Sequence, residues 1–443
     1  MGLLPVNEEL RFCVIGAGRI GLPISVKLAE EGCPVKLLER DDERCLMINK
    51  SSAPFYEEGM QDSLAKAVSE GLLMSGSDPS VISDCNVIIS AIGTGILEDG
   101  TPDIGGIESL VELLAPHLRH GDLVLLKTTL PIGTTEEIGA LLAEASGLVL
   151  DDGLLIAFSP ERIVEGRAME ELGSLPKIVG GVGPNSTSRA CEVMSIFGGR
   201  VIEVSNAKTA EMCKLLDNAY RMTRFGFSAD VATVALRNGI DAYEAISAAN
   251  RDYPRNSIPF PSIGVSGYCL SKDPFYLEIS AVEDWSSRGF QSVWMAARGA
   301  ADYQISLTIN ELKSHFGGSL LGKRIVVAGA TFKENVDDIR ESHGVIIAEL
   351  LSEAGCDVSF WDPVTSKKDI GGMTVHEGED CVEGIDCLII TVPHSEFVAW
   401  ANRLPEIGNA GLKCIYDGWG IIPREIGGWD DFTLMGTGYK RMG

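Results

Sequence analysis

One cysteine in the sequence has neighbours that suit a nucleophile. Residues 264–274 read GVSGYCLSKDP, so Cys269 follows small residues and precedes Lys272 and Asp273. Glycines let the main chain approach a ligand, and a nearby cation such as Lys272 favours the reactive thiolate. The other cysteines lie in apolar strand or helix patterns, where a thiol is usually a small buried side chain. We therefore expect Cys269 to act as a covalent nucleophile from a loop.

A glycine pattern near the start of the chain is typical of a dinucleotide site. Residues 16–21 read GAGRIG, a GxGxxG motif between an apolar run at 11–16 and a helical pattern. In such a motif Gly16 allows a tight turn, Gly18 lets a pyrophosphate approach the main chain, and Gly21 lets helix and strand pack closely. The N-terminus of the helix then faces the phosphates.

The residue that ends the second expected strand bears on the choice of dinucleotide. Glu39 lies about 20 residues after the glycines, where a carboxylate accepts hydrogen bonds from the ribose hydroxyls and repels a 2′-phosphate. Arg40 and Arg44 follow it and could instead accept that phosphate. We expect NAD as the cofactor, with NADP as the alternative.

A scaffold for these residues is indicated by strand-like runs that alternate with helical stretches. The runs lie at 11–16, 34–40, 85–93, 122–129, 154–160 and 177–183. Such alternation predicts a mostly parallel sheet with helices on both faces. From 206 onward, apolar residues recur at helical spacing over a long segment that has Gly239 as its stop.

A helical stretch at about 286–316 leads into a second set of strand-like runs. A strand at 323–332 enters a glycine turn, a helix follows at about 342–354, and CDVSFWDP, DCLIITVP and KCIYDGWG read as further strands. We expect an α/β fold with two Rossmann-like doubly wound domains joined by a long-helix central domain. The expected boundaries are 1–205, 206–317 and 318–443.

Length and composition exclude several classes of protein. A chain of 443 residues predicts two or three domains, and the formal charge of −26 disfavours binding to nucleic acid or to an anionic membrane. The chain has no long apolar run, and its first residues lack the features of a signal peptide, so we expect a cytoplasmic protein. Scattered cysteines and histidines predict reduced thiols and no metal site.

Seven segments resemble the UDP-glucose/GDP-mannose dehydrogenase family, in its order and over nearly the whole chain. They are GAGRIG, PFYEEGM at 54–60, KTTLPIGTT at 127–135, SPERIVEG at 159–166, AEMCKLLDNAYR at 210–221, GVSGYCLSKDP and ATFKENVDDIRES at 330–342. The resemblance implies NAD binding by 1–205, dimerisation and the catalytic cysteine in 206–317, and UDP-sugar binding by 318–443. It further implies oxidation of a sugar C6 alcohol to an acid in two NAD-dependent steps, through a thiohemiacetal and a thioester.

The resemblance assigns catalytic roles residue by residue. Cys269 matches the nucleophile, and Lys214 and Asn218, which share one face of the long helix, match the pair that stabilises negative charge on the reacting oxygen. The remaining matches are Asp273 for proton transfer, Glu161 for thioester hydrolysis and Thr129 for orienting water.

Binding positions follow from the same resemblance. Those for the cofactor are Gly16, Gly18, Arg19, Ile20, Gly21, Glu39, Arg44, Thr94, Thr129, Glu165, Lys272 and Arg340. Those for the UDP-sugar are Glu161, Arg162, Ile163, Lys214, Asn218, Arg255, Gly264, Gly267, Phe332 and Lys333. In the family, the arginine at position 255 reaches the substrate of the neighbouring subunit, which implies a homodimer or a higher homo-oligomer.

The choice of sugar depends on the SPER segment. Arg162 after Glu161 resembles the members that act on UDP-N-acetylhexosamines of manno, gluco or galacto configuration, whereas glucose-type members have Phe-Leu there. UDP-glucose remains the alternative substrate. Two other readings are a two-electron dehydrogenase of the hydroxyacid type and a non-catalytic nucleotide-sugar sensor.

Three segments depart from the family pattern. Ser266 replaces the second glycine of GxGGxC, and a positive φ there would cost of order 1 kcal/mol. Ala229-Asp230 replaces Asn-Glu, and DGWG at 417–420 replaces Asp-x-Arg-Asn. We expect these departures to affect helix packing and the nucleotide pocket rather than the core chemistry.

Overall fold

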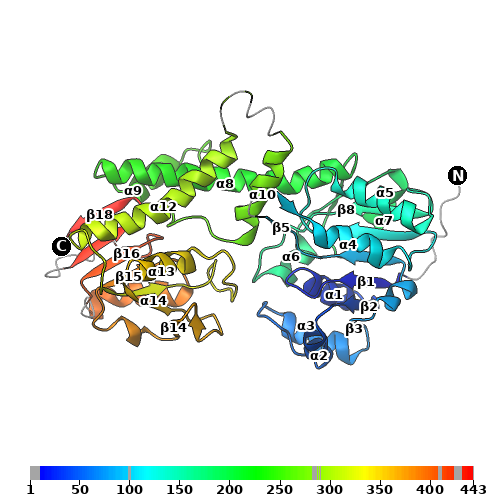
Figure 1. Cartoon of the computed structure of the whole chain (residues 1–443), viewed down its shortest axis with the longest axis horizontal. Helices are drawn as coiled ribbons and strands as arrows, with labels where there is room; N and C mark the ends of the chain where they lie inside the picture. Colours follow the sequence, from blue (N-terminus) through cyan, green and yellow to red (C-terminus); the bar gives the residue numbers. More distant parts are fainter. Residues whose placement is uncertain are drawn as a thin grey trace. The chain divides into compact units, whose positions relative to one another are not determined.

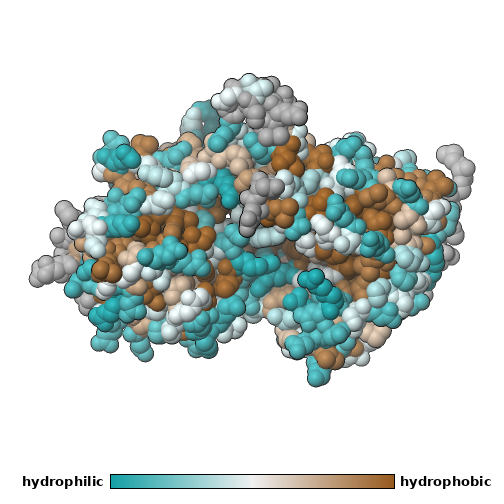
Figure 2. All heavy atoms as spheres, in the orientation of Figure 1, coloured by the Kyte–Doolittle hydropathy of each residue, from teal (hydrophilic) through white to brown (hydrophobic). Residues whose placement is uncertain are grey.

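The computed structural model describes residues 10–97, 101–281, 287, 289, 291–407, 412–423 and 432–442 (Figure 1). Contacts divide the chain into two compact units: Met1–Asp217 with Phe275–Val282, and Asn218–Pro274 with Glu283–Gly443. Hydrophilic and hydrophobic residues are interspersed on the face drawn in Figure 2. In the described parts, no helix combines the length and the apolar character that crossing a bilayer requires.

The first unit contains an eight-stranded sheet of order β10-β9-β8-β7-β4-β1-β2-β3. The parallel strands β3, β2, β1, β4, β7 and β8 have the 3-2-1-4-5-6 order of a dinucleotide-binding fold, whereas β9 is antiparallel to β8. This confirms a mostly parallel sheet, although β3 and β10 were not expected. The strands are β1 (Phe12–Ile15), β2 (Val35–Leu38), β3 (Leu73–Gly76), β4 (Val87–Ser90), β7 (Asp122–Leu126), β8 (Leu154–Phe158), β9 (Lys177–Gly181) and β10 (Val201–Glu203).

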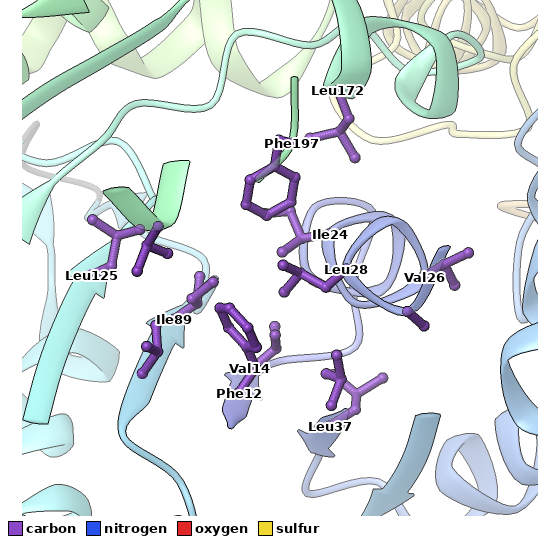
Figure 3. Close-up of a cluster of buried hydrophobic side chains, with 14 of the residues drawn as sticks. Phe12, Val14, Ile24, Val26, Leu28, Leu37, Ile89, Leu125, Leu172 and Phe197 are labelled. Atoms are coloured by element: carbon purple, nitrogen blue, oxygen red, sulfur yellow. The ribbon is translucent and has the colours of Figure 1, made fainter. Parts of the chain in front are cut away.

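Helices cover both faces of this sheet because its strands are apolar on both sides. Phe12 and Val14 enter one buried cluster and Cys13 and Ile15 enter another, as the alternation of side chains along a strand requires. Figure 3 shows the first cluster, to which α1 contributes Leu28. The helices are α1 (Gly21–Glu30), α2 (Asp42–Asn49), α3 (Met60–Ser69), α4 (Gly105–Leu114), α5 (Thr134–Ser146), α6 (Ala168–Ser174) and α7 (Pro184–Ser195), with the short strands β5 (Gly95–Ile96) and β6 (Pro102–Asp103).

The second unit contains another eight-stranded sheet, of order β13-β14-β12-β11-β15-β16-β17-β18. Its parallel strands β14, β12, β11, β15, β16 and β17 repeat the 3-2-1-4-5-6 order. The two doubly wound sheets expected from the sequence are thus confirmed. The elements are β11 (Arg324–Ala328), α13 (His343–Glu353), β12 (Asp357–Trp361), β13 (Asp369–Ile370), β14 (Met373–His376), β15 (Cys387–Ile390), α14 (Ser395–Ile407), β16 (Cys414–Asp417), β17 (Thr433–Gly436) and β18 (Tyr439–Met442).

The helical middle of the chain consists of α8 (Ala207–Arg237), α9 (Ala242–Asn250), α10 (Tyr268–Ile279) and α12 (Val293–His315). The long helix and its stop are confirmed, since Gly239 follows α8 with φ 65°. The helix expected at about 286–316 is described as a helix from Val293, while positions 286, 288 and 290 lie outside the described residues.

The expectation of a loop around Cys269 is wrong, because Cys269 lies in the first turn of α10. Pro274 inside the helix reads as a breaker in the sequence. Side chains such as Lys272 and Tyr276 are also buried, so α10 lacks the apolar stripe by which a surface helix is recognised.

Candidate active site

The GxGxxG turn of the first unit has the geometry that each glycine was expected to provide. Gly16 has φ 96°, and a Cβ on Gly21 would lie 1.8 Å from the carbonyl oxygen of Gly16. A Cβ on Gly18, in contrast, would have no heavy atom within 4 Å. Ile20, the N-cap of α1, makes no side-chain cap hydrogen bond. The turn therefore combines tight helix–strand packing with open space at Gly18, which suits a pyrophosphate.

Glu39 joins the end of β2 to this turn. Its Oε2 accepts a hydrogen bond from the backbone N–H of Ala17 (2.8 Å), and its Oε1 accepts one from the N–H of Asp41 (3.1 Å). The Nη1 atom of Arg44 lies 3.8 Å from Oε2. A carboxylate in this position fits the ribose of NAD, since it already lies against the turn that would hold the pyrophosphate.

Other expected cofactor positions lie at the same carboxyl edge of the sheet. The Oγ1 of Thr94, after β4, donates to the carbonyl oxygen of Thr129, after β7, at 2.8 Å. The Nε of Arg19 lies 3.6 Å from Oε2 of Glu165. Strand ends that are distant in the sequence meet at this edge because the strands are parallel, and ligands of such folds bind there.

Glu161, after β8, is a buried carboxylate with several partners. Its Oε1 accepts hydrogen bonds from the N–H groups of Arg162 (2.8 Å) and Ile163 (3.2 Å), and its Oε2 lies 3.2 Å from Nζ of Lys127. Burial opposes ionisation, but the charge of Lys127 and the N–H of Arg162 outweigh it and lower the pKa of Glu161. The group is therefore a carboxylate at neutral pH.

Lys177 is a charged neighbour of Glu161 that sequence reasoning missed. It begins β9, and because β9 runs antiparallel to β8, the chain places Lys177 at the edge where β8 ends. Burial lowers the pKa of Lys177 to about 8, against the attraction of Glu161, and Lys127 and Arg162 lower it further. A lysine at the start of a strand gives no signal of this role in the sequence.

Two further expected substrate positions belong to the first unit. Arg162 donates from Nη2 to the carbonyl oxygen of Pro176 (2.7 Å), and its Nη1 lies 3.7 Å from Oδ2 of Asp217. Lys214 is buried on α8. Arg162 is thus held by its own unit, next to Glu161 in the chain.

In the second unit, Cys269 is exposed, and Asp273 follows it one helical turn later. Asp273 is fully buried; its Oδ2 accepts a hydrogen bond from Nδ2 of Asn218, and its Oδ1 accepts one from Nζ of Lys272 at 2.6 Å. The first turn of a helix favours an anionic thiolate because the backbone N–H groups point towards it. The structure thus brings together Asn218 of α8 with Lys272 and Asp273, which lie in the same helix as Cys269.

Arg221 extends this network and was missed as a site residue. Its guanidinium donates to Oδ1 of Asn218, which fixes the orientation of the Asn218 amide towards Asp273. The available signal was its spacing, since residues three apart on a helix are neighbours.

The expected strain at Ser266 is absent. Gly264 and Gly267 have positive φ values, 154° and 101°, whereas Ser266 is not among the described non-glycine residues with positive φ. The Ser266 hydroxyl instead accepts a hydrogen bond from the N–H of His343 (3.0 Å). The departure from glycine therefore adds a contact and no backbone strain.

The turn after β11 carries the expected nucleotide positions Phe332 and Lys333. It is organised by Asp362, at the end of β12, which accepts the N–H of Ala330 at 2.7 Å, much as Glu39 accepts that of Ala17 in the first unit. Asp362 is fully buried, and its pKa is lowered. Burial alone would raise this pKa, but His394 and backbone N–H groups outweigh that effect. Asp362 was not expected from the sequence.

Arg340 and Lys272 both contact the ring of Tyr268. The Lys272 ammonium lies 5.5 Å from the ring centroid and the Arg340 guanidinium 5.8 Å, and Nε of Arg340 donates to Asp338 at 2.9 Å. Arg255 belongs to the same unit; it is exposed, and its Nε donates to the hydroxyl of Tyr253 (2.8 Å). Its guanidinium also lies 4.5 Å from the centroid of the Tyr253 ring.

The residues at the two remaining departures make defined contacts. Ala229 is buried, and its carbonyl oxygen accepts a hydrogen bond from Gln304 of α12 (2.8 Å), while Asp230 is exposed. In DGWG, Asp417 accepts the N–H of Trp419 (3.1 Å), and the indole Nε1 of Trp419 donates to the carbonyl oxygen of Thr391 (2.7 Å). Within the described residues, no cluster of three His, Cys, Asp or Glu side chains could hold a metal ion.

The glycine turn, Glu39 and the strand ends of the first unit form a dinucleotide-binding arrangement. The NAD binding domain of the UDP-glucose/GDP-mannose dehydrogenase family matches residues 10–197, its central domain matches 208–298, and its UDP binding domain matches 326–424. The chain therefore belongs to the UDP-glucose/GDP-mannose dehydrogenase family and is an NAD-dependent nucleotide-sugar dehydrogenase.

The chain is similar to known relatives and to a solved structure over most of its length. The chain is 31% identical to UDP-N-acetyl-D-mannosamine dehydrogenase of Pyrococcus horikoshii, covering 97% of this chain and 99% of the relative. It is 30% identical to NDP-N-acetyl-D-galactosaminuronic acid dehydrogenase of Ralstonia solanacearum, over 87% and 90%. The structure of the Pyrococcus horikoshii UDP-D-ManNAc dehydrogenase superposes with a TM-score of 0.86 at 29% identity, covering 97% and 99% of the two chains.

Proposed function

We propose that this protein oxidises the C6 hydroxymethyl group of a UDP-N-acetylhexosamine, of the N-acetylmannosamine type, to a carboxylate through a covalent adduct on Cys269. The observation that carries the proposal is the exposed Cys269 in the first turn of α10, one turn before the buried Asp273 with its Asn218 and Lys272 partners. This arrangement combines a nucleophile with a fixed carboxylate and two donors.

The first oxidation converts the alcohol to an aldehyde. Gly16, Gly18 and Glu39 would hold NAD, which would supply the hydride acceptor, one NAD for each of the two oxidations. Lys214 and Asn218 stabilise the developing negative charge on the C6 oxygen, and Asp273 with a water takes up its proton. The burial of Asp273 and Lys214 supports these roles, because charges act more strongly where water is excluded.

The second half-reaction uses the thiol. The Cys269 sulfur adds to the aldehyde carbon and forms a thiohemiacetal, which loses a hydride and a proton to give a thioester. Glu161 then accepts a proton from a water oriented by Thr129; the water oxygen bonds to the carbonyl carbon, and the carbon–sulfur bond breaks. Each sugar thus consumes one water and reduces two NAD.

The sugar is inferred from the relatives and from Arg162. Dehydrogenases named for N-acetylated sugars, from Pyrococcus horikoshii, Ralstonia solanacearum and Escherichia coli, are among those most similar to the chain. UDP-glucose is the second candidate, because the family includes enzymes of that name. A two-electron dehydrogenase has no need of a nucleophilic cysteine, and the presence of Cys269, Asp273 and Asn218 disfavours a non-catalytic sensor.

A panel of UDP-sugars with NADH counted for each tests the reaction class and the sugar together. We expect two NADH per UDP-N-acetylmannosamine and little turnover of UDP-glucose. One NADH at completion would exclude the four-electron mechanism. The Cys269→Ser variant should stall before uronate release, since an alkoxide is far harder to form than a thiolate at neutral pH; release at the native rate would exclude Cys269 as the nucleophile.

We also propose a homodimer that forms through α8. Tyr220, Phe227 and Val234 recur every seven residues on this helix and are 65%, 54% and 60% exposed. An apolar stripe with this spacing favours packing against a second helix, and a second copy would bring its Arg255. Light scattering should give a dimer for the native chain and a monomer for Phe227→Glu; a native monomer would contradict this proposal. We further propose that the chain divides into three domains, with boundaries at 205 and 317, and that the protein is cytoplasmic.

A further inference from the structure

Two hydrogen bonds join the loop before Cys269 to the segment between β11 and α13. The N–H of Gly267 donates to the carbonyl oxygen of Glu341 (3.1 Å), and the N–H of His343 donates to Oγ of Ser266 (3.0 Å). Ser266 lies three residues before Cys269, and His343 begins α13. The second bond depends on a side chain, so a substitution can remove it.

The rings of His343 and Phe332 also pack closely against this loop. A Cβ on Gly264 would lie 2.1 Å from Nδ1 of the His343 ring, and one on Gly267 would lie 2.8 Å from the ring of Phe332. Only residues without a side chain fit against these rings with the positive φ that both positions adopt. The loop is thus held on both sides of Ser266.

The His343 ring acts by packing. It is buried, and its Nδ1 forms no hydrogen bond with the described part of the chain. Burial and the charge of Arg298 lower the pKa of His343 to about 4, so the ring is neutral at physiological pH. A neutral buried ring beside Gly264 restricts where the loop can lie.

The segment that receives the loop contains backbone strain. Asn335 and Glu341 have φ values of 57° and 51°, a region that non-glycine side chains rarely adopt. Such residues persist where the surroundings hold them, and they gather at functional sites. Here the N–H of Asn335 donates to Nδ1 of His394 (3.0 Å), and the carbonyl of Glu341 accepts from Gly267.

We propose that Ser266 and His343 are positioning residues for Cys269, which hold its loop against the segment that carries Phe332 and Lys333. Occupation of that segment by a nucleoside diphosphate then sets the position of the thiol before the sugar reacts. The inference rests on the proposed function, which assigns the nucleophile to Cys269 and nucleotide contacts to Phe332 and Lys333.

Three substitutions separate the hydrogen bond from the ring. Ser266→Ala removes the acceptor, and His343→Ala removes the ring but keeps the N–H. His343→Pro removes the N–H as well, and proline is favourable there because His343 is the first residue of α13 and Ser342, its N-cap, is already extended (φ −79°, ψ 127°). Ser352→Ala, at an exposed position of α13, is the matched control.

We expect Ser266→Ala to lower kcat about 2- to 10-fold, the effect of one hydrogen bond, with KM for the UDP-sugar changed less. In the His343→Pro background Ser266→Ala should have no further effect, whereas in the His343→Ala background it should keep its full effect. A native kcat for Ser266→Ala, or effects of Ser266→Ala and His343→Pro that multiply, would overturn the inference. If His343→Pro does not fold, the inference is still tested by the kcat of Ser266→Ala alone and by its effect in the His343→Ala background.

The rate of Cys269 alkylation by iodoacetamide provides a readout that does not require turnover. UDP alone should change this rate at least about 2-fold in the native enzyme and in Ser352→Ala, and the change should shrink in Ser266→Ala and in His343→Ala. Equal UDP effects in all variants would overturn the inference. Absence of NADH with every UDP-sugar would instead overturn the proposed function, and the alkylation result would stand apart from it.

Discussion

The Nζ atom of Lys127 lies 3.2 Å from Oε2 of Glu161, with only 1% and 7% of the two side chains exposed. Removing one partner of a buried ion pair leaves an uncompensated charge where water cannot solvate it. The pair therefore keeps Glu161 ionised beside the site, and it makes the fold of this edge depend on Lys127.

Lys127→Met should lower the free energy of unfolding by about 3 kcal/mol, because it leaves the Glu161 carboxylate buried without its cation. Urea denaturation at pH 7 measures the change. Lys208→Met is the matched control, since Lys208 pairs with Glu136 at 2.6 Å on the surface and its loss should change stability much less. Adding Glu161→Gln to Lys127→Met should restore part of the loss, and a further loss would contradict this account.

Lys177→Met should change how stability depends on pH. The pKa of Lys177 is lowered from 10.5 to about 8, so between these values the unfolded chain keeps a proton that the folded chain has released. Native stability therefore rises with pH across this window, and the variant loses that rise. Denaturation at several pH values should show the native-minus-variant difference growing from pH 8 to 10; a difference independent of pH would exclude the shift.

Two glycines of the first turn should respond differently to alanine. Gly18→Ala adds a Cβ in open space, so the variant should fold with a native melting temperature but bind NAD at least about 10-fold more weakly. Gly21→Ala places a Cβ 1.8 Å from the carbonyl oxygen of Gly16 and should destabilise the first unit itself. Calorimetry for NAD binding and thermal unfolding for stability distinguish the two, and equal melting temperatures would contradict the packing argument.

Asp273→Asn should strongly lower turnover while the chain still folds. An amide at position 273 cannot accept from both Asn218 and Lys272, so one donor faces another and the Lys272 ammonium loses its counter-charge. We expect kcat to fall about 10²- to 10⁴-fold, the range for loss of a proton-transfer group. Far-UV circular dichroism is the control and should show a native fold; native kcat would exclude the role.

Much of the fold could be predicted because its signals are local. Strand–turn–helix patterns around residues 16–21 and 329–344 depend on neighbouring residues, and α8 repeats its apolar spacing over many turns. The strands β3 and β10 escaped prediction because such short strands are held by their neighbours in the sheet rather than by their own sequence. The helix around Cys269 escaped because its buried side chains lack periodicity.

The sequence by itself determined the family and the cofactor, and it predicted the nucleophile, because short motifs of fixed spacing carry that chemistry. Only the tertiary structure placed Lys177 at the end of β8, since that depends on the reversed direction of β9. Likewise, the bond between Ser266 and His343 joins residues 77 positions apart, and no local pattern relates them. Chain topology determines which charged and packed side chains meet. Residues that are neighbours in the sequence do not specify that topology.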